Sequence, residues 1–303
     1  MSKKTVLVTG APRSGTTPVG DLISTLDGAY TLYEPMGPTG DVRIKTEFPM
    51  PGEPSFTYDN LKLFHKDLVD LRIRYKSQIR EGHTALQKIR ARIVGSRSLL
   101  SYRLAKMQLK KEILVWKDPH AIFCAGVLPD VSSIITIRPP EAHAASYKRL
   151  GWVSRIDEIY PRYNKKYGEI EGFDELYQKY SKSVVGSAAL LWRLVYQYVL
   201  DMPKEQRNNC YLLNLQNEES EIEAYEKLFS WLGHSITESA RRKIKHRTSQ
   251  NTATIEKPTK VHDFNRTSSQ ANSYWKNTLE NEEIRIVREI NSDLWNEMLL
   301  VKE

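Results

Sequence analysis

The sequence predicts an α/β fold in which helices cover both faces of a parallel β-sheet. Short β-branched apolar segments, typical of buried strands, alternate along the chain with longer segments whose apolar residues recur at helical spacing. No hairpin signal joins two strand segments, which favours parallel pairing. A glycine-containing turn lies between the first strand segment and the first helical one, the position of phosphate-binding loops in such sheets.

The first strand and helix are marked by glycines at their ends. Residues 5–9 form the first strand segment, which ends at Gly10. A helical pattern begins near Ser14 and is closed by Gly28. Residues 29–33 form the second strand segment.

A loop and a helical region follow the second strand. The Gly- and Pro-rich residues 35–54 are expected to form a loop without regular structure. Residues 61–79 carry apolar side chains at helical spacing and predict one amphipathic helix. Gly82 breaks this helix, and a second begins near Leu86.

The rest of the chain continues the alternation of strands and helices. Three more strand segments are expected, at residues 112–116, 133–137 and 210–215. Helices are expected to end near Leu150 and to cover residues 173–200, 220–232 and 275–298. The polar residues 246–273 are expected to form a long loop.

Composition indicates a soluble globular protein. Its length fits one α/β domain with an insertion as well as it fits two domains, and we expect one domain over residues 1–303. A hydrophobic content of 40% and a charged content of 27% lie in the globular range. No apolar run is long enough to span a membrane, and the N-terminal residues lack the apolar core of a signal peptide. Cys124 and Cys210 are too few for a disulfide framework and lack metal-ligand spacing, so we expect buried free thiols and a cytoplasmic location.

The positive charge of the chain is concentrated in one segment. The net charge is +8, yet residues 61–111 alone carry 14 Lys and Arg against three Asp and Glu. We expect a basic helical insertion over residues 55–111 that covers one side of the ligand cleft, which is the acceptor side if the protein transfers a group between two ligands. Either it binds an acidic ligand, or it rests on an anionic membrane. No nucleic-acid-binding motif accompanies the charge, so no nucleic acid is expected as partner.

The loop after the first strand resembles a phosphate-binding loop without its lysine. In VTGAPRSGTT, Gly10, Gly15 and Thr17 keep the spacing G-x-x-x-x-G-K-[ST], but Thr16 replaces the lysine. The only cation of the loop is Arg13. Backbone N–H groups of residues 14–17 at a helix N-terminus can hold a phosphate. The missing lysine disfavours metal-assisted phosphoryl transfer, and no metal is expected.

Charged side chains follow four of the predicted strands. Ligands of open parallel sheets bind outside the carboxyl ends of the strands, so these side chains are expected at one site. They are Arg13, Glu34, Lys117 and Arg138. Arg138 precedes a helix that carries Ser146 about two turns along, and this pair could hold a second, terminal phosphate.

These motifs together resemble the sulfotransferases that use 3′-phosphoadenosine 5′-phosphosulfate. The resemblance rests on APRSGTT after a strand, RPPEAHAAS after a later strand, and KDP between them. It implies that Arg13, Ser14, Gly15, Thr16 and Thr17 bind the 5′-phosphosulfate of the donor. It also implies that Arg138 and Ser146 bind the 3′-phosphate, with Arg266 as a further candidate on that side.

The resemblance also implies sulfuryl transfer to an acceptor hydroxyl, with Arg13 and Lys117 as cations. The base differs among such enzymes: those acting on carbohydrates use a glutamate after the second strand, which Glu34 matches in the segment LYEP. Those acting on phenols and steroids use a histidine two residues after the lysine, whereas His120 lies three residues after Lys117. We therefore expect Glu34 as base and a glycan or glycolipid as acceptor. The alternatives are a small phenol or alcohol acceptor with His120 as base, and a P-loop nucleotide kinase.

One position departs from the pattern of the family. Many members carry an aromatic residue just after the loop, near the adenine, whereas this chain has Pro18. Another residue must stack on the base, and the sequence does not indicate which.

For a cytoplasmic enzyme that rests on a membrane, the contact would be peripheral, at the inner face.

Overall fold

The computed structural model describes residues 4–77, 84, 95–214, 221–249 and 272–300. The chain divides into two compact units. The first contains nearly all of the β-sheet and comprises residues 1–10, 16–135 and 203–211. The second is mostly helical and comprises residues 11–15, 136–202 and 212–303. That the chain forms one domain stays a prediction.

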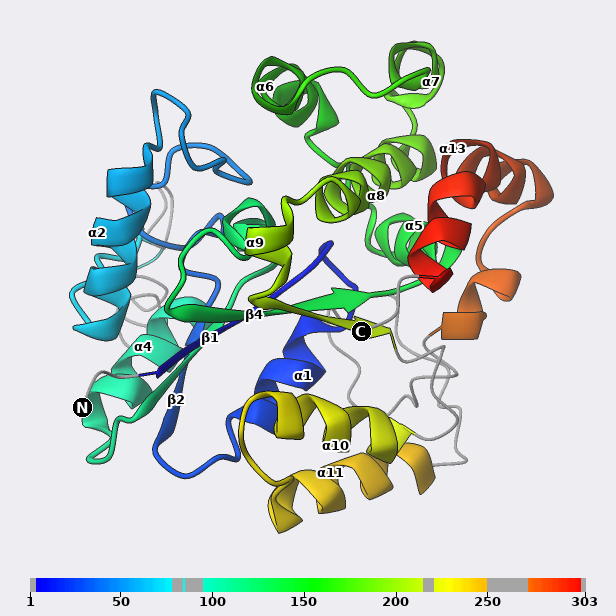
Figure 1. Ribbon diagram of the computed structural model, residues 1–303. Helices are drawn as coiled ribbons and strands as arrows, with labels where there is room; N and C mark the ends of the chain where they lie inside the picture. Colours follow the sequence, from blue (N-terminus) through cyan, green and yellow to red (C-terminus); the bar gives the residue numbers. More distant parts are fainter. Residues whose placement is uncertain (1–3, 78–83, 85–94, 215–220, 250–271, 301–303) are drawn as a thin grey trace. The chain divides into compact units, whose positions relative to one another are not determined.

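The fold is α/β, as expected, with a five-stranded sheet of order β2-β3-β1-β4-β5 (Figure 1). Strand β1 pairs in parallel with β3 and β4, and β2 pairs in parallel with β3. The strands are β1 (Lys4–Thr9), β2 (Ala29–Tyr33), β3 (Ile113–Lys117), β4 (Val131–Ile137) and β5 (Cys210–Asn214). Every expected strand segment is present, with bounds shifted by at most two residues.

Helices cover both faces of the sheet in the first unit. Successive side chains of a strand point to opposite faces, so Trp116 and Lys117 of β3 mark the two sides. The ring of Trp116 packs against Phe64 at a centroid distance of 5.9 Å, whereas the side chain of Lys117 passes Gly20. The helices concerned are α2 (Tyr58–Val69) and α1 (Thr16–Ile23).

Helix α4 (Arg97–Met107) lies along β2, the edge strand of the sheet. An edge strand presents backbone groups that have no neighbouring strand to bond. Here the hydroxyl of Ser101 accepts a hydrogen bond from the Tyr33 N–H at 3.0 Å. Gln108 donates to the carbonyl of Ala29 at 2.8 Å. Because Ala29 begins β2 and Tyr33 ends it, α4 runs antiparallel to the strand.

Helix α8 is the centre of the second unit and contacts α5, α6, α7 and α13 (Figure 1). Arg193 of α8 donates two hydrogen bonds to the carboxylate of Asp293 in α13, at 2.6 and 2.8 Å. No helix in the described part of the chain is long and apolar enough to cross a bilayer. The helices are α5 (Pro140–Leu150), α6 (Ile156–Tyr167), α7 (Phe173–Tyr180), α8 (Val184–Leu200), α10 (Glu221–Trp231), α11 (Glu238–Ser249) and α13 (Asn281–Leu300).

The single amphipathic helix expected over residues 61–79 is wrong beyond Val69, where α2 ends. Leu71 has a φ of 55°, in the left-handed region that a helix cannot include. The chain then bonds to Asp41, whose carboxylate accepts from the Arg74 N–H at 3.1 Å. These long-range bonds outweigh the helical periodicity of the segment. The second helix, expected to begin near Leu86, lies outside the described residues.

Two expectations for the later helices are also wrong. The helix expected over residues 173–200 is divided into α7 and α8, because the Ser183 hydroxyl accepts from the Gly186 N–H and begins a new helix. Helix α6 was not expected at all. The loop expected over residues 246–273 is helical up to Ser249, and its residues 250–271 lie outside the described part.

The last helix also differs from its expected bounds. A short 3₁₀ turn, η2 (Tyr274–Asn277), precedes α13, so the continuous helix begins at Asn281 rather than near residue 275. Of the two cysteines, both of them free thiols, Cys124 is buried as expected, whereas Cys210 is only half-buried. Helix α10 and the glycine that ends it, Gly233 with a φ of 77°, match the expectation.

The start of α2 offers a test of local stability. Thr57 and Asn60 form a reciprocal cap, with the Thr57 hydroxyl accepting from the Asn60 N–H at 3.1 Å and the Asn60 side chain accepting from the Thr57 N–H at 2.9 Å. Thr57→Ala should lower the free energy of unfolding by about 1 kcal/mol, measured by urea denaturation. Thr57→Ser keeps the hydroxyl and should lose less; equal losses for the two variants would contradict the cap.

Candidate functional site

The strand register brings the carboxyl ends of β2, β3 and β1 to one level. Lys117, the last residue of β3, is in register with Tyr33 of β2 and Val8 of β1. Glu34 follows Tyr33, and its backbone N–H donates to the carbonyl of Lys117 at 2.7 Å. Glu34 and Lys117 therefore lie side by side at the sheet edge where ligands of parallel sheets bind.

The side chains of these two residues form an ion pair. The Lys117 ammonium donates to a Glu34 carboxylate oxygen at 2.5 Å. The Lys117 side chain is only 3% exposed, whereas that of Glu34 is 34% exposed. A buried ammonium is costly unless a carboxylate compensates it, so Glu34 neutralises Lys117 while remaining open to solvent. Glu34 also has a φ of 48°, a strained value for a non-glycine residue that is often found at functional sites.

Asp118 is a buried carboxylate that holds the segment carrying Glu34. One of its oxygens accepts from the Met36 N–H at 2.6 Å, and the other accepts from the His120 N–H at 3.0 Å. Burial and the nearby Glu34 carboxylate raise the pKa of Asp118 to about 7. In the sequence, Asp118 stands out only as part of the KDP segment, because neither its burial nor its long-range bond to Met36 can be read from neighbouring residues.

His120 lies near the same two residues. A Cβ built on Gly37 would be 3.0 Å from the Glu34 Cβ and 3.3 Å from the His120 ring, so both side chains border this glycine. The ring packs against Phe48 at a centroid distance of 4.9 Å. Burial lowers the pKa of the imidazole, so His120 is neutral at neutral pH and could accept a proton. Geometry within the first unit thus keeps both candidate bases, Glu34 and His120, beside each other.

Helix α1 contacts the stem of Lys117. A Cβ on Gly20 would lie 3.1 Å from the Lys117 Cγ, so a larger residue at this position would require the lysine stem to shift. Thr16 and Thr17, which begin α1, are both buried. The turn before them requires glycine at Gly15, where φ is 105°.

The candidate phosphate-binding residues of the second unit form one hydrogen-bonded cluster. The Arg13 Nε donates to the Ser146 hydroxyl at 2.9 Å, and Arg138 donates to the Arg13 carbonyl at 2.9 Å. The Ser14 and Thr136 hydroxyls are 2.6 Å apart. Arg13 is thereby brought to Arg138 and Ser146, which lie 125 and 133 positions later in the chain. Arg266, the remaining candidate, lies outside the described residues.

The turn itself differs in one respect from a cradle of four amides. The Ser14 N–H donates to the Ala11 carbonyl at 3.0 Å within the turn. Arg13 adopts a φ of 73°, which turns the chain sharply just before Ser14. A phosphate at this turn would therefore meet the guanidinium of Arg13 together with amides that follow Ser14.

Aromatic rings and a neutral histidine surround the two guanidiniums. The Arg13 guanidinium carbon is 5.9 Å from the ring centre of Trp152, and that of Arg138 is 5.7 Å from Tyr274. Burial and the Arg138 charge lower the pKa of the fully buried His143 to about 3, so it adds no charge. Trp152 and Tyr274 are functional candidates that the sequence analysis missed, because the strand-end pattern it used does not include them.

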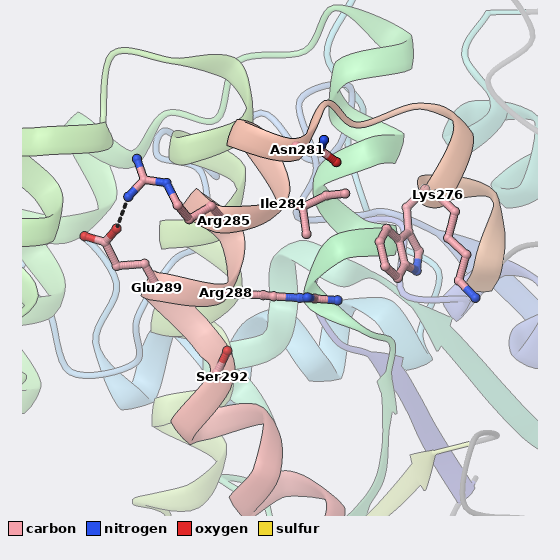
Figure 2. A pocket seen from close by; sticks show the side chains of 8 residues that line it. Lys276, Asn281, Ile284, Arg285, Arg288, Glu289 and Ser292 are labelled. Carbon is pink, nitrogen blue, oxygen red and sulfur yellow. Dashed lines mark ion pairs between the residues drawn. The ribbon is translucent and has the colours of Figure 1, made fainter.

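A separate pocket of about 760 Å³ lies on the surface of α13 (Figure 2). Arg285 pairs there with Glu289 at 3.7 Å, and Arg288 pairs with Glu141 at 3.0 Å. None of the expected site residues lines it. The expected ligand site and this pocket are therefore different places. The described residues include no cluster of three metal-ligating side chains.

Comparisons with known proteins give a likeness of fold only. No protein-family model matches the chain, and no curated protein does. Two of the solved structures that match are sulfotransferase domains. One is from the curacin biosynthetic pathway, with a TM-score of 0.43, 11% identity and coverage of 95% of this chain and 97% of that one. The other is a sulfotransferase domain from the olefin synthase of Synechococcus PCC 7002, with a TM-score of 0.41, 14% identity and coverage of 95% and 94%. At these values, the function must be judged from the side chains.

The raised pKa of Asp118 predicts a pH-dependent stability. A carboxyl with a pKa of about 7 when folded and 3.8 in its ordinary state keeps a proton that the unfolded chain loses. Its contribution to stability is therefore largest below about pH 4 and falls as the pH rises towards 7. We therefore expect the unfolding free energy of the wild type to fall relative to that of Asp118→Asn as the pH rises from 4 to 7, because the asparagine does not titrate. A difference that is constant from pH 4 to 7 would contradict the raised pKa.

Proposed function

We propose that this protein is a sulfotransferase that moves a sulfuryl group from 3′-phosphoadenosine 5′-phosphosulfate to a hydroxyl of an acceptor. The main support is the hydrogen-bonded cluster of Arg13, Arg138 and Ser146 behind a phosphate-binding loop that has Thr16 in place of lysine. Two guanidiniums and a hydroxyl suit a nucleotide with a phosphate at each end of its ribose. The loop lacks the cation that metal-assisted transfer of a γ-phosphate uses.

The donor would be held by charge-assisted hydrogen bonds. In the proposed arrangement Arg13 and the amides at the start of α1 bind the 5′-phosphosulfate, with Arg138 and Ser146 on the 3′-phosphate. Among the groups that these side chains bond are a hydroxyl, a carbonyl and the Asn272 amide oxygen, which are neutral acceptors. An anionic phosphate competes well with neutral acceptors for a guanidinium.

The Glu34–Lys117 pair would perform the transfer. Glu34 accepts the proton of the acceptor hydroxyl, whose oxygen then forms a bond to the sulfur of the donor. The bond between that sulfur and the bridging phosphate oxygen breaks, and adenosine 3′,5′-bisphosphate leaves with its electron pair. Lys117 stabilises negative charge on the sulfuryl oxygens, and Arg13 stabilises it on the leaving phosphate. Asp118 is a positioning residue, because it holds the backbone just after Glu34.

A glycan or glycolipid with an acidic group is the proposed acceptor class. Arg97, the first residue of α4, places its guanidinium 4.0 Å from the ring centre of Tyr33. The Lys117 ammonium is 5.5 Å from the same ring. Arg97 thus extends the positive charge at the Glu34–Lys117 pair outward, because its own side chain is exposed. A carboxylate, sulfate or phosphate on the acceptor would be attracted to this position.

Trp152 is proposed as the ring that stacks on the adenine. It lies beside the Arg13 guanidinium and is 38% exposed, so one part of the indole remains open to a ligand. An aromatic ring at this place would take over the role that Pro18 cannot perform.

Two alternatives differ in their prediction for base and ligand. His120 as base would favour a small phenol or alcohol as acceptor. This alternative is supported by the position of His120, whose ring borders Gly37 together with the Glu34 side chain. A P-loop kinase would require magnesium-dependent binding of ATP, which the missing loop lysine disfavours.

The identity of the base is tested by two isosteric variants. Glu34→Gln can still accept a hydrogen bond from Lys117 but cannot take a proton, so kcat should fall by about 10²- to 10⁴-fold. His120→Asn should change kcat by less than about tenfold, since on this reading it does not transfer the proton. Turnover is measured with radiolabelled sulfuryl donor over a panel of glycans, glycolipids and phenols. Substantial turnover by Glu34→Gln would mean that Glu34 only orients Lys117. A larger loss of kcat in His120→Asn than in Glu34→Gln would make His120 the base.

Nucleotide binding tests the donor site without any acceptor. We expect calorimetry in excess EDTA to detect adenosine 3′,5′-bisphosphate, and Arg138→Ala to weaken it by about tenfold to a hundredfold through loss of a charged hydrogen bond. Adenosine 5′-monophosphate, which lacks the 3′-phosphate, is the matched control and should bind this variant almost as it binds the wild type. Trp152→Ala should weaken both nucleotides alike, and Trp152→Phe should restore binding. ATP that binds only with magnesium would instead favour a kinase.

A further inference from the structure

Helix α4 has one face against the sheet edge and another that is open. Its buried side chains are small or hydrogen-bonded to neighbouring backbone, as in Ser101 bonded to Tyr33 and Tyr102 bonded to the Leu71 carbonyl at 2.6 Å. The contacts of this face hold α4 on β2. Within the described part of the chain, the opposite face makes no contact that explains its apolar side chains.

Large apolar side chains are exposed on that opposite face. Leu100, Leu104 and Met107 are 41%, 58% and 77% exposed, and Leu109, just beyond the helix, is fully exposed. Residues at spacings of three and four lie on one side of a helix, so Leu100, Leu104 and Met107 form a stripe along α4, and the exposed Leu109 follows its end. We call residues Leu100, Leu104, Met107 and Leu109 the α4 outer stripe. Single exposed leucines are common on soluble proteins, whereas a contiguous apolar surface marks an interaction site.

The charges of α4 and of the residues just after it are positive. Residues 97–111 contain five Lys and Arg and no Asp or Glu. Lys110 is paired with Asp27 and Glu112, so it adds little net charge. The other basic residues are Arg97, Arg103, Lys106 and Lys111. Exposed apolar side chains beside long basic ones can bind an anionic bilayer, because the apolar groups enter the acyl region while the basic groups stay at the headgroups.

We propose that the α4 outer stripe docks on an anionic lipid bilayer, with its leucines and methionine among the acyl chains and its basic residues at the headgroups. Charge complementarity selects an anionic surface, and the apolar side chains select a partner with an apolar phase. A polysaccharide or nucleic acid would satisfy the first requirement only, because neither offers a phase into which leucine can be buried.

Docking through α4 would also bring the active-site end of β2 to the membrane. The helix begins at Arg97, which stacks on Tyr33, and Tyr33 precedes Glu34 in the chain. A hydroxyl on a glycolipid headgroup would then meet the Glu34–Lys117 pair from the side of α4. This consequence rests on the proposed function, whereas the docking itself depends on α4 alone.

Flotation of the full-length protein with vesicles tests the docking. The vesicles are phosphatidylcholine alone, or phosphatidylcholine with about 30% phosphatidylglycerol to make the surface anionic. We expect binding to the anionic vesicles that weakens with added salt, and at least about tenfold weaker binding to the neutral ones. The variant Leu100→Ser/Leu104→Ser/Met107→Ser should bind the anionic vesicles at least about tenfold less.

Matched variants separate the two parts of the surface. Leu63→Ser removes a 53% exposed leucine from α2, outside the α4 outer stripe, and should bind vesicles within about twofold of the wild type. Arg103→Glu/Lys106→Glu keeps the stripe and reverses two charges, and should lose about twentyfold or more on anionic vesicles. An unchanged midpoint of urea unfolding for each variant shows that the fold is intact, whether or not the protein binds nucleotide.

Three results would overturn the proposal. They are equal binding to neutral and anionic vesicles, wild-type binding by the stripe variant, and a dimer in size-exclusion chromatography that the stripe variant abolishes while vesicles do not bind. The last would make a second copy of the chain the occupant of the surface. Vesicle binding without nucleotide binding would leave the docking in place and remove the proposed function, so the two failures are distinguishable.

Discussion

The buried ammonium of Lys117 is the constraint on which the first unit depends. A lysine that is 3% exposed at the end of a parallel strand must be compensated by a nearby negative charge. Glu34 provides it with a left-handed backbone, and Gly20 lies close to the lysine stem. Removing one partner of a fully buried pair typically costs about 3–5 kcal/mol, and we expect a smaller cost here because Glu34 is one-third exposed. A strained backbone such as that of Glu34 typically costs about 1–3 kcal/mol, which the ion pair must offset.

The same ammonium faces two carboxyl groups whose surroundings separate their behaviour. Asp118 is fully buried, accepts backbone N–H groups and has its pKa raised to about 7, so it organises the loop that follows Glu34. Glu34 is one-third exposed and can meet a ligand. Environments that divide two neighbouring carboxyls into different roles are typical of acid–base sites. The proposed division of labour between base and positioning residue follows from this difference in burial.

In the second unit, neutral groups bond the two guanidiniums of the proposed donor site. Arg13 and Arg138 donate to a hydroxyl, a backbone carbonyl and an amide oxygen. A neutral acceptor orients a guanidinium without cancelling its charge, and His143 adds no charge because burial and Arg138 keep it neutral. This arrangement suits the doubly phosphorylated donor that we propose, because the cations are oriented before the ligand binds.

The sequence by itself determined the strands, the loop after the first of them and the charged residues at strand ends, since these follow from local periodicity and turn chemistry. It determined less about the helices. The pattern over residues 61–79 is helical throughout, but Leu71 and the bonds from Asp41 end the helix early, and Ser183 divides α7 from α8. Only the tertiary structure decided that Asp118 is buried and accepts a hydrogen bond from the Met36 N–H, and that Arg13 donates to Ser146. It also decided that α4 exposes an apolar stripe to solvent. Each of these depends on contacts between residues far apart in the chain, which no local pattern records.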